Sequence, residues 1–578
     1  GQVQYPKQEL PDEVKWGEDK WDPDYRDNNR INSHKTGTSP CKTACPAHIA
    51  VQGYLKKASQ GKYQEALALI KKQNPFPAVC GRICNRRCEE ACTRGTIDEA
   101  VAIDAVKKFI AEQDLKAETR YIPPVVIPAS IHMDHFPEKL AIIGGGPAGL
   151  SAAFYLAEKG YRPTVFEKNE MPGGMLHYGI PSYKLEKDVI QAEIDVMREM
   201  GVEIRTGVEV GKDITIKELR AQGYKAFYIA IGCSAGRLPG VEGDQAEGTM
   251  PDIDYLHEAN TGNTSYTGKV VVVGGGNVAV DAARVSARSG ALEVLQVSLE
   301  SEKEMPASAE ELREAAEDGV SVKCGWGPMK VLTEDGKVTG IVFKKCVSVF
   351  NGEGKFAPVY DEKETMTIEC GRVIFAIGQR TLWGSLLEGE KVEFKGPAIV
   401  ADPLTFQTGQ PDIFVGGDVY TGPKFAIDAI AAGHHAAESL HRYVHNGHMT
   451  IGRNTWEFNE LDKDNISVES YDHSSRQREG LDPAVPEKSF RDAHLTLTEE
   501  QVRKETARCL GCGATIVDEN KCIGCGVCTT KCQFDAITLH RDRPECTNMV
   551  TAEDKFKQII PYQLKRAVKI VTHKKDKA

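Results

Sequence analysis

The chain has 578 residues, of which 41% are hydrophobic and 27% are charged, and its formal net charge at pH 7 is −11. This composition is typical of a globular chain of several domains, and the negative charge argues against nucleic acid as a partner. The sequence has no run of about 18 apolar residues that could span a membrane, and its charged N-terminal stretch does not match a secretory signal, so we expect a cytoplasmic protein.

Cysteine is the unusual component of the composition, with 17 residues gathered mainly near the two ends of the chain. Six lie between Cys41 and Cys92, and seven lie between Cys509 and Cys546. In a chain without an export signal, clustered cysteines favour metal or redox centres over disulfides.

The first cysteines follow a polar stretch, residues 1–38, which we expect to be an extended arm. The region after the arm has a helical pattern, and four of its six cysteines are spaced by four residues, which puts successive thiols on one helical face. The six are Cys41, Cys45, Cys80, Cys84, Cys88 and Cys92. Soft thiolate ligands favour an iron–sulfur cluster, and a structural zinc site is the alternative.

The CGRIC and CExxC motifs of this region resemble the start of the glutamate synthase small-subunit family. That family includes the large subunit of the NADH-dependent ferredoxin–NADP oxidoreductase and the N-terminal region of dihydropyrimidine dehydrogenase. Relatives carry two clusters here and use a CxxCxxxxCxxxCP run, of which this chain keeps only Cys41 and Cys45. The resemblance therefore implies that half of the ligands of one cluster are missing.

The same resemblance assigns Cys45, Cys84 and Cys88 to the other cluster. Relatives complete it with a Gln or Glu on the next helix, where this chain offers Lys in the stretch Ile103 to Lys108. The two cysteines left over from the lost cluster, Cys41 and Cys92, are available to replace that ligand. We therefore expect one N-terminal [4Fe–4S] cluster rather than two.

After a proline-rich linker, residues 140–167 have the pattern of a dinucleotide-binding βαβ unit. An apolar strand ends at a GxGxxG turn, a helix of small residues follows, and a second strand ends in Glu167. The turn and the helix N-terminus suit a pyrophosphate, and Glu167 suits a ribose. The residues expected to contact the dinucleotide are Gly144, Gly146, Pro147, Ala148, Gly149, Glu167 and Lys168.

A Gly- and Pro-rich stretch follows, and it matches the family signature GG-x-L-x-x-GIP-x-x-KL. In the family this stretch lies along the isoalloxazine ring, where close backbone approach tunes the flavin. Without the resemblance it would read as a surface loop. The residues that the resemblance implies are Gly174, Met175, Gly179, Ile180 and Lys184.

A second βαβ unit begins at Lys269 with KVVVVGGGNVAVD. Two such units in one chain match a flavoprotein of the glutathione-reductase type, with FAD in the first and NAD(P)H in the second. The contacts expected in the second unit are Gly274, Gly276, Asn277, Val278 and Ala279, and the strands that cross between the domains end near Gly232 and Gly378.

Nicotinamide specificity should depend on the end of the second strand of this unit. Relatives that use NADP have Tyr-Arg-Arg there, whereas this chain has Ser298-Leu299-Glu300. Glu300 can accept hydrogen bonds from a free ribose 2′-OH and would repel a 2′-phosphate, so we expect NAD(H) to be favoured over NADP(H). Arg284 and Arg288 leave NADP(H) open, because either could reach a phosphate.

We expect the stretch VIFAIGQ, Val373 to Gln379, to be the strand that returns to the flavin domain. A GGD motif follows, and the resemblance places Gly417, Asp418, Lys424 and Ala426 near the flavin. Four cysteines lie between the two cysteine-rich ends of the chain: Cys233, Cys324, Cys346 and Cys370. They form no CxxC or CxxxxC pair, so the flavin has no local disulfide acceptor.

The C-terminal region has a connector with a helical stretch near Thr498 to Ala507, and the second group of cysteines follows. Cys509 and Cys512 precede the bacterial ferredoxin pattern CxxCxxCxxxC. The expected metal ligands of this region are Cys509, Cys512, Cys522, Cys525, Cys528, Cys532 and Cys546. The three at 522, 525 and 528 indicate one [4Fe–4S] cluster, with zinc as the alternative. Cys532 could join Cys509, Cys512 and Cys546 in a second.

The fold class that we predict is multidomain: a helical Fe–S domain, two α/β Rossmann-type domains of the glutathione-reductase kind and a small α+β ferredoxin-like domain. The expected order is an arm (1–38), the Fe–S domain and linker (39–130), the first segment of the FAD domain (131–255), the NAD(P)H domain (256–372), the second segment of the FAD domain (373–450), a connector (451–508), the ferredoxin-like module (509–550) and a Lys-rich tail (551–578).

This order predicts an FAD-dependent NAD(P)H oxidoreductase in which the flavin is the redox centre and no side chain is catalytic. We expect an electron-transfer subunit of a larger hetero-oligomer that exchanges single electrons with ferredoxin or a partner redox enzyme, an arrangement compatible with electron bifurcation. The alternative is the small subunit of an NAD(P)H-dependent glutamate synthase. A scaffold that only relays electrons through clusters is a third option, disfavoured by the complete nucleotide motifs.

Overall fold

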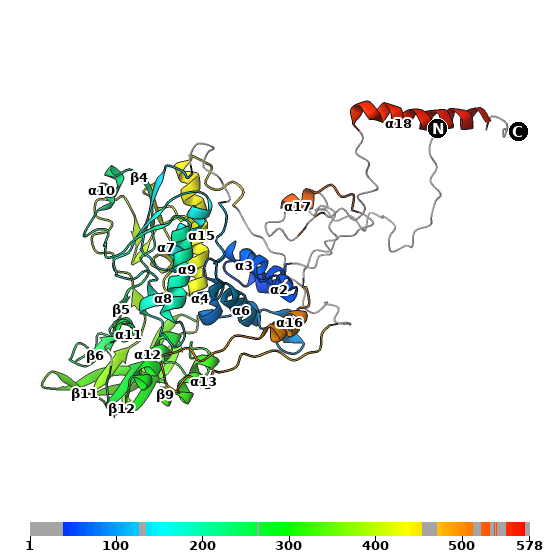
Figure 1. Cartoon of the computed structure of the whole chain (residues 1–578). Helices are drawn as coiled ribbons and strands as arrows, with labels where there is room; N and C mark the ends of the chain where they lie inside the picture. The colour runs from blue at the N-terminus through cyan, green and yellow to red at the C-terminus, as the bar shows by residue number, and fades with distance from the viewer. Residues whose placement is uncertain are drawn as a thin grey trace. The chain divides into compact units, whose positions relative to one another are not determined.

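The structure is a computed structural model that describes residues 38–125, 134–262, 265–453, 471–512, 522–531, 537, 539 and 551–572 (Figure 1). The chain divides into two compact units. One comprises His34–Thr515, and the other comprises Gly1–Ser33 with Ile516–Ala578.

The larger unit begins with a helical domain, as the sequence predicts. Its α-helices are α1 (Pro40–Thr43), α2 (Val51–Ser59), α3 (Tyr63–Lys71), α4 (Pro77–Ile83), α5 (Arg87–Glu90) and α6 (Ile103–Leu115). A 3₁₀ turn, Thr93–Thr96, follows α5. Buried apolar side chains such as Phe76, Val79 and Val106 form the core between α4 and α6. The helices thus place all six N-terminal cysteines on a packed scaffold.

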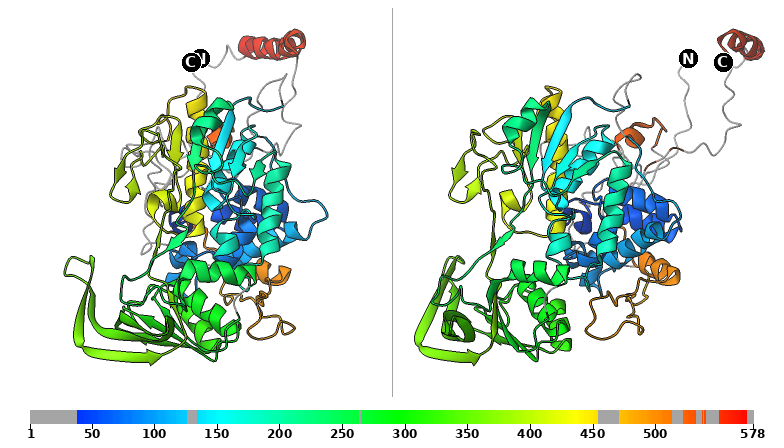
Figure 2. Two further views of the ribbon diagram at one scale, coloured as in Figure 1. Left: turned by 90° about the vertical axis from the view of Figure 1, so that its left-hand side faces the viewer. Right: turned by 60° about the vertical axis from the view of Figure 1, so that its left-hand side comes forward.

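The flavin domain has a parallel five-stranded sheet in the order β17-β4-β1-β2-β3. The strands are β1 (Lys139–Ile143), β2 (Thr164–Phe166), β3 (Glu203–Arg205), β4 (Tyr224–Ile229) and β17 (Ile413–Val415). The helices around it include α7 (Pro147–Glu158), α8 (Met175–Tyr178), α9 (Lys187–Glu199), α10 (Ile216–Ala221), α14 (Asp418–Thr421) and α15 (Ala426–Val444). Figures 1 and 2 show α15 running alongside α7. A Cβ atom on Gly433 would lie 2.3 Å from the carbonyl oxygen of Ala148, so this close packing requires glycine.

The nicotinamide domain has a second parallel sheet in the order β6-β13-β7-β8-β9. The strands are β6 (Thr249–Pro251), β7 (Lys269–Val273), β8 (Glu293–Ser298), β9 (Val320–Cys324) and β13 (Arg372–Phe375), and the helices are α11 (Asp252–Thr261), α12 (Asn277–Arg288) and α13 (Ala309–Glu317). A long antiparallel sheet extends from this domain (Figure 2): β10 (Trp326–Glu334), β11 (Lys337–Phe350) and β12 (Phe356–Glu369).

The position of β13 corrects one expectation. The strand that begins VIFAIGQ pairs with β6 and β7, so it belongs to the nicotinamide sheet and not to the flavin domain. The crossing lies just beyond it, where β14 (Gln379–Arg380) pairs with β5 (Ala235–Gly236). Both sheets need the same kind of apolar strand ending at a glycine, which is why the pattern alone assigned β13 to the wrong sheet. Two short strands, β15 (Phe394–Lys395) and β16 (Ala398–Ile399), follow.

Residues 471–512, here called the strap, return from the nucleotide domains to the N-terminal helices (Figure 1). Arg288 of the nicotinamide domain donates to the carbonyl oxygen of Ser489, and Lys108 donates to that of His494 at 3.2 Å. The strap includes α16 (Glu499–Ala507), which begins with a capping box of Thr498 and Gln501, so the expected helix is confirmed.

The smaller unit contains α17 (Val527–Lys531) and α18 (Ala552–Thr572). The expected α+β ferredoxin-like fold lies largely outside the described residues. The stretch that we expected to be a solvated tail forms α18, because apolar residues recur between its lysines at helical spacing, among them Phe556, Ile560, Leu564 and Val568. In the portion of the chain that the structure describes, no helix is long and apolar enough to cross a membrane.

Candidate redox site

The first glycine-rich turn leaves no room for side chains at two of its glycines. A Cβ atom on Gly144 would lie 2.4 Å from the carbonyl oxygen of Ala230, and one on Gly149 would lie 2.0 Å from that of Gly144. Gly146 is the N-cap of α7. The turn therefore offers the backbone N–H groups of the helix N-terminus to a pyrophosphate, so these residues fit a bound dinucleotide.

Glu167 reaches back to this turn from the end of β2. Its carboxylate accepts a hydrogen bond from the backbone N–H of Gly145 at 2.7 Å and another from that of Asn169 at 2.9 Å. Its side chain is buried. An acidic group held at this place suits the ribose of the dinucleotide, as the sequence predicts.

Two later segments converge on the same turn. A Cβ atom on Gly174 would lie 2.9 Å from the Cα atom of Gly146, and one on Gly417 would lie 2.8 Å from the Cβ atom of Ala148. The next residue, Asp418, accepts a hydrogen bond from the backbone N–H of Lys424 at 3.2 Å. Burial raises the pKa of Asp418 to about 6. The structure thus brings the predicted flavin-binding segments together, although their sequence positions are far apart.

Lys184 has a different environment from the one that we expected. Its ammonium group forms ion pairs with Asp281 and Glu311 of the nicotinamide domain, each at 2.5 Å. Burial opposes its charge, but the two carboxylates raise its pKa. Lys184 therefore ties the flavin domain to the nicotinamide domain, a role that the family signature does not indicate.

The second glycine-rich turn repeats the geometry of the first. A Cβ atom on Gly274 would lie 2.2 Å from the carbonyl oxygen of Ala376, and one on Gly275 would lie 2.5 Å from the Oε2 atom of Glu300. The carboxylate of Glu300 thus lies against the middle glycine of its turn, as that of Glu167 does in the flavin domain. Glu300 therefore holds the same position relative to its turn as Glu167 does in the flavin domain.

Arg284 and Arg288 are paired with acidic side chains of the nicotinamide domain. Arg284 donates to Asp318 at 2.8 Å and to Glu314, and Arg288 donates to Asp318 at 3.0 Å. Both guanidinium groups lie over the ring of Tyr183, at 4.7 and 4.2 Å from its centroid. Their charges are therefore already compensated within the domain.

The other predicted nucleotide contacts lie in the segments that surround the two turns. Gly232 and Gly378 follow the carboxyl ends of β4 and β13, where α/β sheets bind ligands. Asn277 opens α12 and accepts a hydrogen bond from the backbone N–H of Ser308 at 3.0 Å. The remaining ones are Pro147, Lys168, Met175, Gly179, Ile180, Gly276, Val278, Ala279 and Ala426.

One group of cysteines gathers beside a buried lysine. Cys84 lies within electrostatic range of Cys45, and Cys88 lies within range of Cys84, while burial raises the pKa of Cys84 and that of Cys88. Burial opposes the charge on Lys107, but Asp104 and the thiol of Cys84 raise its pKa well above its usual range. The three ligands that the resemblance implies therefore lie near one another. A fourth thiol nearby, that of Cys80, was not among the expected ligands.

This group lies against the flavin domain. Arg87, next to Cys88, donates to both carboxylate oxygens of Asp428 on α15, at 3.1 and 3.3 Å. Its guanidinium carbon also lies 5.5 Å from the ring centroid of Phe425, the N-cap of α15. The helix that the sequence places at the flavin therefore touches the helix that carries a cluster ligand.

The other N-terminal cysteines are not placed as we expected. Cys41 and Cys92 line a cavity together with Cys509 and Cys512. The sequence suggested one of the first two as a fourth ligand for the neighbouring group, and grouped the last two with Cys532 and Cys546. The residues at 532 and 546 lie outside the described residues. A local motif could not have revealed this pairing, although the two missing N-terminal cysteines and the extra CxxC motif at 509 were a signal.

In the smaller unit, Cys522 and Cys525 are exposed and Cys528 is half-buried. The backbone N–H of Gly524 donates to the sulfur of Cys522 at 3.4 Å. Such N–H···S contacts are typical of thiolate ligands of iron–sulfur clusters. Cys233, Cys324, Cys346 and Cys370 form no disulfide, and neither do the other cysteines that the structure describes.

Comparison with protein families agrees with this geometry. Residues 138–433 match the pyridine nucleotide-disulphide oxidoreductase family. Residues 30–119 match dihydropyrimidine dehydrogenase domain II with its 4Fe–4S cluster, and residues 515–538 match a 4Fe–4S binding domain.

Curated relatives match most of the chain. The NADP(+)-dependent formate dehydrogenase subunit beta of Moorella thermoacetica is 36% identical over 82% of this chain and 70% of its own length. The glutamate synthase [NADPH] small chain of Escherichia coli is 32% identical over 71% of this chain and 89% of its own length. The NAD-dependent dihydropyrimidine dehydrogenase subunit PreT of Salmonella typhimurium is 31% identical over 70% of this chain and 91% of its own length. The chain therefore belongs to the pyridine nucleotide-disulphide oxidoreductase family, as an FAD- and nicotinamide-dependent oxidoreductase with 4Fe–4S domains.

Proposed function

We propose that this chain is the electron-transfer subunit of a larger complex, in which it joins a nicotinamide pool to ferredoxin or to a partner redox enzyme. The observation that carries the proposal is the contact of Arg87 with Asp428 and Phe425, because this contact joins the helix that bears Cys88 to the flavin helix. A bound FAD would accept the electron pair of a hydride and release it one electron at a time to clusters.

The chain's own residues provide position and electrostatics. The two glycine-rich turns hold the dinucleotides, and the ion pairs of Lys184 with Asp281 and Glu311 hold the nucleotide domains together. The guanidinium of Arg87 fixes the first cluster site against α15. No free thiol pair is needed for this chemistry, because the electrons leave through clusters.

We infer that the nicotinamide is NAD(H). Glu300 supports this inference, because a carboxylate against Gly275 would accept hydrogen bonds from a ribose 2′-OH and repel a 2′-phosphate. The ion pairs of Arg284 and Arg288 with Asp318 support it too, since they occupy the two cations that could otherwise hold the phosphate. The relatives include both NADP- and NAD-dependent proteins, so residue 300 is the informative position.

Two cluster sites follow from the expected ligands. One is held by Cys45, Cys84 and Cys88, and the other by Cys522, Cys525 and Cys528 in the smaller unit.

The second candidate function is the small subunit of a glutamate synthase. The match to 89% of the E. coli small chain favours it, and the ferredoxin-type motif beyond that match favours the first candidate.

The test is to purify the intact complex under anaerobic conditions, identify its subunits and measure its cofactors. We expect one FAD per chain, iron and sulfide, a partner redox subunit, and rapid bleaching of the flavin by NADH. A glutaminase-bearing partner would establish the second candidate instead. A complex without FAD would overturn both.

A further inference from the structure

The cavity beside the N-terminal helices is lined by four cysteines from distant regions of the chain. Cys41 lies in α1, Cys92 lies just after α5, and Cys509 and Cys512 come from the end of the strap. Cys41 is buried, and apolar side chains such as that of Leu55 complete the lining. Four thiols with a largely apolar surround are the environment of an iron–sulfur cluster.

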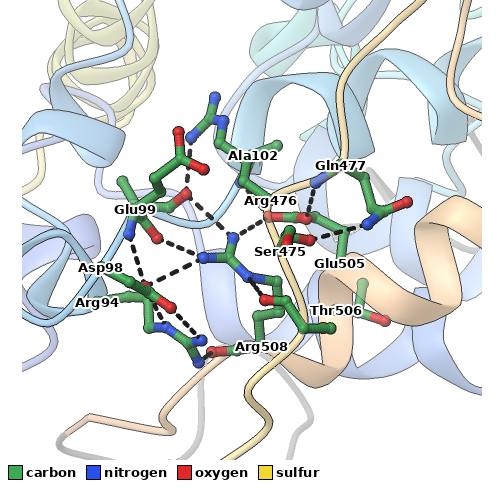
Figure 3. A network of polar contacts seen from close by, with 12 residues as sticks. Arg94, Asp98, Glu99, Ala102, Ser475, Arg476, Gln477, Glu505, Thr506 and Arg508 are labelled. Atoms are coloured by element: carbon green, nitrogen blue, oxygen red, sulfur yellow. Dashed lines mark hydrogen bonds and ion pairs between the residues drawn. The ribbon is translucent and has the colours of Figure 1, made fainter.

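The strap is fixed in this position by a buried polar network (Figure 3). The side chain of Arg508 is 1% exposed, and it donates to Glu505 at 2.7 Å and to the carbonyl oxygen of Glu99 at 2.6 Å. Arg94, which is fully buried, donates to the carbonyl oxygen of Arg508 at 3.0 Å and forms an ion pair with Asp98. A charge is buried in this way only when its partners are fixed, so Cys509 has a defined place next to the N-terminal domain.

A direct contact holds the far end of the CxxC motif. The side-chain amide of Gln52 on α2 donates to the carbonyl oxygen of Cys512 at 2.6 Å. Gly511 adopts a φ of +66°, which lets the chain turn between the two cysteines. Both thiols of the motif can therefore be presented to the same cavity.

The four thiols also lie near one another. Cys41 lies within electrostatic range of the thiols of Cys509, Cys92 and Cys512. Within the described residues, no group of three or more potential ligands converges on a point that would hold a single metal ion. The four cysteines line one cavity, the arrangement in which four thiolates can hold a cubane of four irons.

We propose that Cys41, Cys92, Cys509 and Cys512 bind one [4Fe–4S] cluster, for which the C-terminal strap supplies the two ligands that the N-terminal motif lacks. The site is separate from that of Cys45, Cys84 and Cys88. The buried side chain of Tyr54 lies within electrostatic range of one cysteine of each group, Cys88 and Cys41. The N-terminal domain then holds two clusters, where the sequence alone predicted one. The inference rests on the proposed function, because both require that the chain carries iron–sulfur clusters.

The test counts iron, sulfide and zinc in the anaerobically purified full chain and in two paired variants, Cys41→Ser/Cys92→Ser and Cys509→Ser/Cys512→Ser. Each pair should lose about four irons and four sulfides, together with the same EPR signal in the reduced protein. The variant with all four substitutions should lose no more than either pair. Cys324→Ser/Cys346→Ser, in the nicotinamide domain, is the matched control and should lose none.

Additive losses of about eight irons would overturn the proposal, because the two pairs would then serve different clusters. Unchanged iron with the loss of about one zinc would overturn it in favour of a zinc site. FAD content and NADH-dependent dye reduction report folding and the proposed function independently of the cluster. If a paired variant also loses FAD, the single variant Cys512→Asp decides: an EPR spectrum identical to that of the parent protein would contradict the proposal.

Discussion

At the scale of single residues, two carboxylates define the nucleotide sites. Glu167 and Glu300 lie at the ends of the second strands of their domains, and each carboxylate lies against the middle glycine of its turn. Equivalent geometry in both domains suggests the same task, which is recognition of a ribose hydroxyl group. Under the proposed function, Glu300 is the residue expected to set the nicotinamide preference.

We expect the substitution Glu300→Ser to reduce the preference for NADH over NADPH. Removing the carboxylate eliminates its repulsion of the 2′-phosphate and its hydrogen bond to the ribose, and the ratio of kcat/KM values should change by about 10- to 100-fold, which corresponds to roughly 1.4 to 2.8 kcal/mol. Steady-state dye reduction with each nucleotide measures the ratio. Glu302→Gln, at an exposed position nearby, is the control. A parent protein that already prefers NADPH would refute the assignment.

At the scale of elements, α15 links the Fe–S domain to α7 of the flavin domain. Its N-terminal residues contact Arg87 of the Fe–S domain, its middle packs on α7 through Gly433, and two adjacent histidines lie on it. Burial lowers the pKa of His434 to about 3 and that of His435 to about 4. The ring of His434 also stacks on Tyr155 at 4.0 Å between centroids.

These histidines make the flavin domain sensitive to acid. Their folded pKa values are lower than their unfolded value of 6.5, so the folded state holds fewer protons and its stability declines as the pH falls from about 6.5 towards 4. We expect His434→Phe, which retains the stacking, to flatten this decline by up to about 1 kcal/mol per pH unit. Thermal unfolding of the FAD-loaded protein between pH 4.5 and 7.5 measures it, with His473→Asn as an exposed control. An unchanged slope would show that His434 has no such role.

The helices and strands also show which features of the fold local sequence patterns can predict. The sequence predicted β1, β8 and the two glycine turns to within a residue or two, because each combines an apolar strand with glycines that no other residue can replace. It placed β13 in the wrong sheet, because an apolar strand carries no information about which of two similar sheets it joins. For the same reason, the sequence motifs did not indicate that Cys41 and Cys92 lie beside Cys509 and Cys512.

At the scale of the whole molecule, the strap connects the end of the larger unit to its beginning. Arg94 and the carbonyl oxygen of Arg508, which it contacts, are 414 positions apart in the sequence. Glu505 is also bound by the backbone N–H groups of Ala102 and Gln477, so three segments share one buried carboxylate. No periodicity or spacing in the sequence can indicate contacts of this length.

Removing the guanidinium group of Arg508 should loosen this closure. Arg508→Met leaves the buried Glu505 without its ion-pair partner, and we expect a loss of roughly 3 to 5 kcal/mol in the stability of the N-terminal domain. Arg503→Met, on the same helix, removes only an exposed pair with Glu499 and should cost much less. Denaturant unfolding followed by cluster absorbance compares the two variants. Equal losses of stability in the two variants would mean that burial of the network does not add to the stability of the domain.

The 414-position contact also orders events during synthesis. The N-terminal helices leave the ribosome first, and domains usually fold as they emerge. Here Arg94 can donate to the carbonyl oxygen of Arg508 only after Arg508 has been translated. The four-cysteine site likewise cannot bind a cluster before Cys512 has been translated. A message truncated anywhere between the nucleotide domains and the strap would yield a chain that has both dinucleotide sites but lacks Cys509 and Cys512, together with the ferredoxin-type cysteines beyond them. Iron delivery to this site therefore requires that translation has passed Cys512, which makes the cluster a chemical mark of a chain translated through the strap.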